Sequence, residues 1–166
     1  MPLRAMFGIS VILSFISWGI IARRYIWPAL RRAPRVEAMR PLLLLHTFRF
    51  VGLAFLIPGV VSPDLPAAFA RPAAYGDLSS SILALLAIAT LGSTLGIILA
   101  WAFNILGTAD LLYAFYEGNR VHLDSAPGLQ GAAYFIPTVL VPLLLITHAL
   151  LFLLLLKRGV EVVPRD

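Results

Sequence analysis

Long apolar runs alternate with short polar segments along this chain, and the polar segments contain most of the prolines. Four runs cover residues 3–22, 41–61, 79–106 and 131–156. A helix needs about 20 apolar residues to cross a hydrocarbon core of about 30 Å. The pattern therefore predicts an all-α fold, a polytopic membrane protein with a four-transmembrane-helix bundle. We expect one integral membrane domain over residues 1–166.

The segment between the first two runs, residues 23–40, carries six arginines and is interrupted by prolines. A cleaved signal peptide would end in small residues. Here the first run ends in a basic and aromatic edge that includes Arg23 and Trp27, so we expect a retained anchor. The prolines argue against a long helix in this segment. We interpret it as an Arg-rich loop that fixes the orientation of the chain.

The composition supports a membrane protein, with 60% hydrophobic and 13% charged residues and a mean hydropathy of +0.92. Soluble domains carry about 25% charged residues. The net charge of +5 comes largely from the Arg-rich loop, so we expect the lipid bilayer as a partner and no nucleic acid. With no cysteine, the chain has no disulfide, thiolate metal site or cysteine nucleophile.

Four spans would place both termini on one side of the membrane. The loops on the opposite side, 23–40 and 117–130, would hold seven arginines, against five basic residues on the termini side. Cytoplasmic loops are enriched in Lys and Arg. We therefore expect both loops in the cytoplasm, both termini outside, and a bacterial-type plasma (inner) membrane.

His46 and Arg49 lie inside the second apolar run, and they define the candidate site. An arginine at such depth is costly unless it faces the bundle or reaches the headgroups. Counting about 1.5 Å per residue brings polar groups of the other spans to a similar depth in the cytoplasmic half. The predicted ligand-binding residues are His46, Arg49, Trp101, Asn104, Asp110, Ser14 and Ser17.

Two interpretations of Arg49 remain open at this point. In one, it reaches the headgroups; in the other, it is buried against Asn104, Asp110 or a bound anion. No acidic residue lies squarely within a predicted span, which argues against an ion pump. A guanidinium suits phosphate or carboxylate. The sequence thus favours binding or movement of a small anionic or amphipathic ligand, with an anionic lipid or small anion as partner.

Haem is the one cofactor that the sequence suggests, because His46 and His148 both lie within predicted spans. A haem-binding electron-transfer subunit is the first alternative. The four-span topology places the two histidines about 10–17 Å apart in depth, which disfavours a shared iron. A single histidine, His46 or His148, with another second ligand remains open.

The sequence contains no metal-ligand spacing and no nucleophile, base and acid at one depth, so we expect a protein that is not an enzyme. A non-catalytic accessory subunit of a larger membrane complex is the second alternative. Small residues recur every four positions at Gly92, Gly96 and Ala100, ending in Asn104. Such a ridge predicts close helix contact, within the chain or in a homo-oligomer or larger complex.

Overall fold

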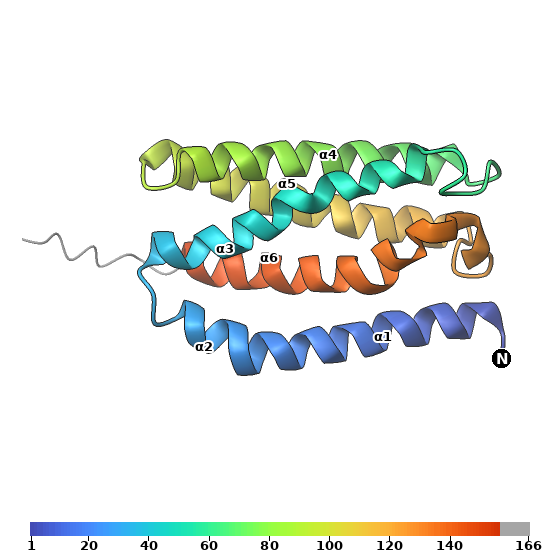
Figure 1. The fold of residues 1–166 in the computed structure, drawn as a ribbon, viewed down its shortest axis with the longest axis horizontal. Helices are drawn as coiled ribbons and strands as arrows, with labels where there is room; N and C mark the ends of the chain where they lie inside the picture. The colour runs from blue at the N-terminus through green and yellow to red at the C-terminus, as the bar shows by residue number, and fades with distance from the viewer. Residues whose placement is uncertain (157–166) are drawn as a thin grey trace, which may run out of the picture.

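The computed structural model describes residues 1–156, which form a bundle of helices with no strand in that range (Figure 1). The predicted all-α class is confirmed. Three long α-helices are continued or preceded by short helices of other types. The elements are α1 (Leu3–Ile21), η1 (Ala22–Ile26), α2 (Trp27–Leu30), α3 (Arg35–Thr47), η2 (Phe48–Leu56), α4 (Ala67–Ala89), α5 (Thr94–Arg120), η3 (Pro127–Tyr134), η4 (Ile136–Leu140) and α6 (Val141–Leu156).

Five helices of the described residues are long and apolar enough to cross a membrane, where the sequence predicted four. They cover Leu3–Leu30, Arg35–Leu56, Ala67–Ala89, Thr94–Arg120 and Ile136–Leu156. The prediction of one span over residues 79–106 is wrong, because α4 ends at Ala89 and a tight turn leads into α5. At about 1.5 Å per residue, the predicted span would have been far longer than a bilayer requires.

The turn between α4 and α5 removes Gly92 from the predicted ridge of small residues, whereas Gly96, Ala100 and Asn104 are all buried on α5. Gly92 lies in the turn with a φ of +108°, a conformation that suits glycine. Ser93 caps α5 by accepting a hydrogen bond from the backbone N–H of Gly96. Gly96 lies against the carbonyl of Thr90 in the same turn. The two glycines therefore close a hairpin and do not share one helix face.

Other predicted boundaries also shift. The Arg-rich loop 23–40 is helical on both sides of a short connection, residues 31–34. Pro41 lies inside α3 and does not begin it. The polar loop 117–130 starts only after Arg120, because α5 continues without a break through Gly107 and Asp110. Apolar packing and paired charges hold these stretches helical although their composition resembles that of loops.

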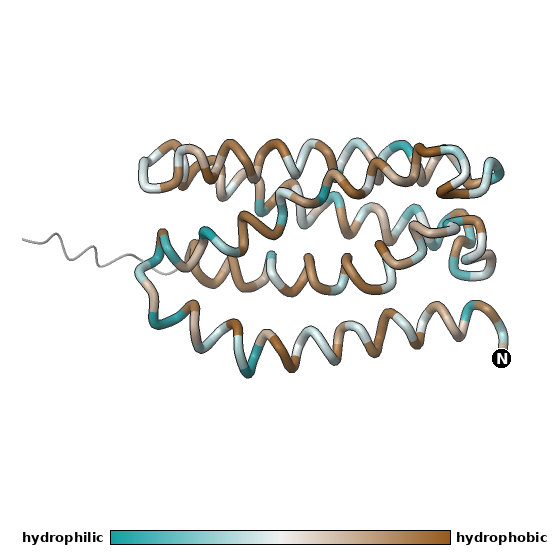
Figure 2. The backbone as a smooth tube through the Cα atoms, in the orientation of Figure 1, coloured by the Kyte–Doolittle hydropathy of each residue, from teal (hydrophilic) through white to brown (hydrophobic). Residues whose placement is uncertain are grey.

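The helices pack into two apolar clusters, one toward each end of the bundle. One cluster joins α3, α4, α5 and α6 near the Arg-rich end and includes Met39, Leu43 and Phe103. The other includes Phe55, Phe69 and Leu111 and lies toward the opposite end. Polar residues of the same helices fall between the two clusters in sequence. Figure 2 accordingly shows teal segments midway along the bundle as well as at its ends.

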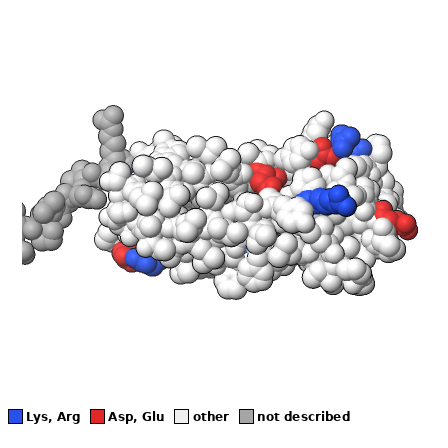
Figure 3. Space-filling model, turned by 90° about the horizontal axis from the view of Figure 1, so that it is seen from above, with Lys and Arg blue, Asp and Glu red and all other residues white. Residues whose placement is uncertain are grey.

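Helix α1 lies along one side of the bundle, where it packs against α6 and η4 (Figure 1). Its outer face leaves large apolar side chains exposed, among them Ile12, Leu13, Ile16 and Ile20. On the face drawn in Figure 3, charged side chains are few and most lie toward the ends. An apolar surface of this extent fits contact with lipid.

The described chain begins and ends at opposite ends of the bundle, since five helices alternate in direction (Figure 1). The C-terminus, which the four-span prediction placed on the same side as the N-terminus, lies outside the described residues. The extra helix also reverses the direction of α6 relative to the four-span prediction. Leu156 therefore lies at the Arg-rich end, where Arg35 donates a hydrogen bond of 2.8 Å to the Leu155 carbonyl.

Irregular helix geometry occurs where the polar residues lie. The chain changes from an α-helix to a 3₁₀-helix after Thr47, and the Thr47 carbonyl accepts a hydrogen bond from the Ser81 hydroxyl. Mid-helix 3₁₀ segments often mark functional positions. Helix α6 is preceded by the π-helix η4, which contains Pro137. These two irregular segments face the ionic cluster and pocket described below.

Candidate functional site

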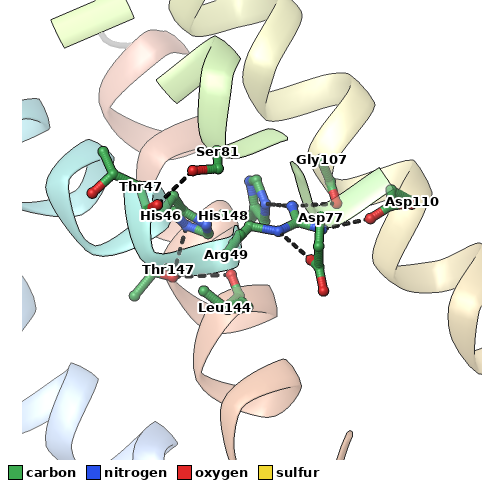
Figure 4. Close-up of polar contacts among 10 residues, drawn as sticks. All are labelled: His46, Thr47, Arg49, Asp77, Ser81, Gly107, Asp110, Leu144, Thr147 and His148. Carbon is green, nitrogen blue, oxygen red and sulfur yellow. Dashed lines mark hydrogen bonds and ion pairs between the residues drawn. The ribbon is translucent and has the colours of Figure 1, made fainter. Parts of the chain in front are cut away.

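Arg49 is the centre of the site, and it is 3% exposed. Its Nε donates to Asp77 Oδ1 at 2.7 Å and its Nη2 to Asp110 Oδ2 at 2.6 Å (Figure 4). Its Nη1 donates to the Gly107 carbonyl at 3.1 Å. The interpretation of a buried arginine paired with Asp110 is confirmed. The alternative of an arginine that reaches the headgroups is wrong.

Asp77 is the functional residue that the sequence prediction missed. It lies between the predicted spans 41–61 and 79–106, but α4 begins at Ala67 and holds Asp77 about 15 Å along the helix. Asp110 lies equally far from the end of α5 at Arg120. The argument that no carboxylate lies within a span is therefore wrong. The apolar stretch that follows Ala67 was long enough for a further helix, which was the available signal.

Glycines make room for this cluster at three points. An added Cβ at Gly52 would overlap the Asp77 carboxylate, and one at Gly76 would overlap that of Asp110. A Cβ at Gly107 would lie 2.7 Å from Arg49 Nη1 and 2.8 Å from His148 Cε1. Such separations force neighbours to move. At Gly52, Gly76 and Gly107 the charged side chains therefore pack directly against the backbone, in the space that a Cβ would fill.

His148 connects Arg49 to α5. Its Nδ1 lies 2.6 Å from Asn104 Oδ1, and the Asn104 amide nitrogen donates to the His148 carbonyl at 3.3 Å. An amide oxygen only accepts, so Nδ1 of His148 donates. Nε2 of a neutral ring then accepts, and it lies 3.4 Å from Arg49 Nη1. Asn104, a predicted site residue, thus orients the histidine that faces the arginine.

The two membrane histidines lie side by side, with ring centroids 4.2 Å apart. The predicted difference in their depth is wrong, because it followed from the reversed direction of α6. The His46 Nε2 lies 3.0 Å from Thr147 Oγ1, whose hydroxyl reaches the carbonyls of Leu143 and Leu144. Rings in direct contact leave no space between them for the iron of a shared haem. Within residues 1–156, no group of three His, Asp or Glu side chains is placed to hold a metal ion.

Three other predicted site residues lie elsewhere. Ser14 donates to the Val139 carbonyl at 3.4 Å, and Ser17 is exposed on α1. Trp101 packs against Phe152, with ring centroids 6.0 Å apart. The sequence prediction began the second span at Pro41, but α3 begins at Arg35, so Arg49 lies about 20 Å along its helix while Trp101 lies only about 10 Å from the start of α5. Ser14 and Ser17 lie on α1, which packs at the side of the bundle. The structure unites Arg49, His46, Asn104 and Asp110.

A cavity of about 290 Å³ lies above the two carboxylates. Asp77 and Asp110 line it together with the aromatic side chains of Phe7, Phe55, Phe69 and Phe115. Arg4 and Asp124 also line it, and their side chains form an ion pair of 2.7 Å toward the end where α1 begins. The cavity is thus apolar along its walls and acidic at its inner end.

Gln130 is the second polar feature of the cavity wall. Its residue is 0% exposed, and among residues 1–156 neither its Nε2 nor its Oε1 has a hydrogen-bond partner. An unpaired buried amide costs free energy comparable to a lost hydrogen bond or more. The next residue, Gly131, has a φ of +50°, and its backbone packs closely against the Val60 carbonyl. A bound polar group would satisfy the amide.

A second cavity of about 180 Å³ lies on the other side of the Arg49–Asp77 pair. Its walls come from η2 and α6 and are apolar, with Phe48, Leu140 and Leu144 among them. Asp77 and Ile136 line both cavities. The ionic cluster therefore separates two spaces within the bundle.

The fold and the site define a class: a helical bundle with five helices of membrane-crossing length and a buried ionic cluster between two apolar halves. Residues 6–156 match a protein family described as a domain of unknown function, DUF8737, and the chain belongs to this family. Neither the curated proteins nor the solved structures include a significant match to it.

Proposed function

We propose that this chain is an integral membrane protein with its Arg-rich end in the cytoplasm. Of the ten basic residues described, six lie near the Arg-rich end (Arg23, Arg24, Arg31, Arg32, Arg35, Arg40) and three near the opposite end (Arg4, Arg71, Arg120). Positive residues favour the cytoplasmic side. Met1 is then outside, Leu156 is at the cytoplasmic face, and the Arg4–Asp124 pair marks the outer end of the 290 Å³ cavity.

The function we propose is binding of a small amphipathic ligand in this outer cavity. The observation that carries it is that the buried, unpartnered amide of Gln130 and the two carboxylates line one cavity whose walls are mainly apolar. Ligand sites are typically apolar with a few convergent polar groups. An apolar body would contact the phenylalanines, and its polar end would meet Gln130, Asp77 or Asp110.

A simple anion fits this site less well than the sequence suggested. The guanidinium of Arg49 already donates to two carboxylates and a carbonyl, so it offers no free fork. A carboxylate or phosphate in the cavity would face Asp77 and Asp110 and be repelled. The cavity therefore suits an amphipathic ligand that is not an anion.

Cysteine protection tests the proposed function directly, because the chain has no cysteine of its own. Ala114 lines the cavity and is half-buried, so an Ala114→Cys variant in nanodiscs should react slowly with a small maleimide. We expect millimolar 2-phenylethylamine to slow the reaction severalfold by occupying the cavity. Two further probes, 2-phenylethanol and 3-phenylpropionate, also carry a phenyl group but end in a hydroxyl or a carboxylate. Their effects on the labelling rate show how protection depends on the polar end group.

The matched control is Ser125→Cys, exposed at the same end of the molecule but outside the cavity. Its labelling rate should not change with any of the three probes. If none of the probes slows labelling at position 114 relative to position 125, the cavity does not bind amphipathic molecules of this size and the proposed function is wrong.

A further inference from the structure

The charges of the cluster do not balance when every group is ionised. Arg49 contributes one positive charge, since an arginine stays protonated. Asp77 and Asp110 each pair with that guanidinium, at 2.7 and 2.6 Å. Two ionised carboxylates would leave one net negative charge inside the bundle. An unbalanced buried charge is strongly unfavourable.

No other cation within the described residues reaches these carboxylates. His148 faces Arg49 through Nε2 while its Nδ1 bonds Asn104, which is the arrangement of a neutral ring. His46 lies behind His148 and bonds Thr147. Arg4 lines the outer part of the cavity, and its own partner is Asp124. The remaining charge must be balanced by a proton or by a bound cation.

We propose that the ligand of this cavity is an organic cation, an ammonium group on an apolar body, and that it exchanges for one proton at the Asp77–Asp110 pair. This inference rests on the proposed function. Without the ligand, one carboxyl keeps a proton and the cluster is neutral. When the ammonium binds, that proton leaves to solvent and the cluster is again neutral.

The cavity supplies groups suited to both parts of such a ligand. The carboxylates accept charge-assisted hydrogen bonds from an ammonium, and the Gln130 amide oxygen can accept another. The aromatic rings of Phe55, Phe69 and Phe115 offer apolar contact and favour a nearby cation. The Arg4–Asp124 ion pair lines the opposite end of the cavity and adds no net charge there.

Calorimetric titration of the whole protein in nanodiscs measures the exchange. Binding of 2-phenylethylamine should release about one proton, seen as a change in binding enthalpy between buffers of different ionisation enthalpy. Its affinity should rise about tenfold per pH unit through the range in which the pair holds its proton, as linkage requires for one proton. Binding of 2-phenylethanol should show neither effect.

An Asp110→Asn variant separates this exchange from other effects. It keeps a neutral Arg49–Asp77 pair, so the protein should fold, which size-exclusion chromatography checks. It should bind 2-phenylethylamine at least tenfold more weakly and release no proton. Asp64→Asn, which removes an exposed carboxylate outside the cavity, should behave as the unmodified protein.

The outcomes of this test are distinct from those of cysteine protection. If the alcohol and the amine bind alike and neither releases protons, the exchange is wrong while the binding cavity remains. The same conclusion follows if the amine binds with no proton release and no change with pH. Failure of all three probes to protect position 114 would remove both proposals.

Discussion

At the residue scale, Arg49 determines the polar chemistry of the bundle. Its side chain donates to groups on α4 and α5 and faces α6, so one residue of η2 holds three other helices. The sequence offered a buried arginine, with Asn104, Asp110 or an anion as its partner, as one of two interpretations, because an arginine at that depth needs a partner or must reach the headgroups. It could not indicate Asp77, since the pairing becomes visible only once α4 is known to begin at Ala67, twelve residues before the predicted span.

We predict that Arg49→Leu strongly destabilises the protein. Breaking a buried ion pair by removing one partner costs about 3–5 kcal/mol, because the other charge stays buried without compensation. The combined variant Arg49→Leu, Asp77→Asn, Asp110→Asn should recover much of that loss. Thermal unfolding in detergent, followed by circular dichroism, measures both.

The control for this prediction is Arg40→Leu, whose partner Glu37 lies 3.5 Å away with both side chains largely exposed. Exposed pairs contribute little, so the unfolding temperature should hardly change. An Arg49→Leu variant as stable as Arg40→Leu would mean that the cluster does not hold the helices together.

At the element scale, the sequence predicted which stretches are apolar better than where helices begin and end. Three predicted spans each overlap one membrane-length helix of the structure. The fourth, residues 79–106, covers the end of α4 and the start of α5. Hydropathy hardly changes across the turn, because Leu91 and Ser93 flank a single Gly92. The start of α4 was missed for the opposite reason: Arg71, Pro72 and Asp77 resemble a loop, and only tertiary pairing makes Asp77 compatible with a helix.

We predict that the hairpin between α4 and α5 depends on Gly96. A Cβ there would overlap the Thr90 carbonyl, so Gly96→Ala must shift the turn and should lower stability by about 1–3 kcal/mol. Gly19→Ala is the matched control, since a Cβ at Gly19 meets nothing within 4 Å. Alanine is about 1 kcal/mol better than glycine in a helix, so that control should be neutral or more stable. Equal unfolding temperatures for the two variants would contradict the packing of the turn.

At the scale of the whole molecule, one missed helix accounts for most of the errors in the predicted site. Because one helix was missed, α6 was predicted to run in the opposite direction. The predicted depths of His46 and His148 therefore differed, although their rings are in contact. The missed helix also left Asp77 and Asp110 outside the predicted spans, although both lie within helices of membrane-crossing length. Arrangement of the helices depends on their number, so a local error in one boundary changes the depth of every later residue.

The assembled molecule places the cluster as a polar layer between two apolar halves. Each of α4, α5 and α6 passes from one apolar cluster to the other, and its polar residues lie where it does so: Asp77 and Ser81 on α4, Asn104 and Asp110 on α5, Thr147 and His148 on α6. The outer cavity ends at this layer. A ligand in the cavity would therefore meet Asp77 and Asp110 at about the middle of the bundle.

The orientation of the bundle is the last prediction, and single cysteines test it because the chain has none. Arg32→Cys lies in the connection between α2 and α3, and Ser125→Cys lies after α5 at the opposite end. Both positions are exposed. With the Arg-rich end in the cytoplasm, a membrane-impermeant maleimide added to intact cells with permeable outer layers should label position 125 and not position 32. Lysis before labelling should make position 32 reactive, which shows that its cysteine is accessible in itself.

Labelling of position 32 alone in intact cells would invert the orientation and place the amphipathic cavity on the cytoplasmic side. Labelling of both positions from outside would contradict the odd number of spans, since only an odd number separates the two ends of the described chain across the membrane.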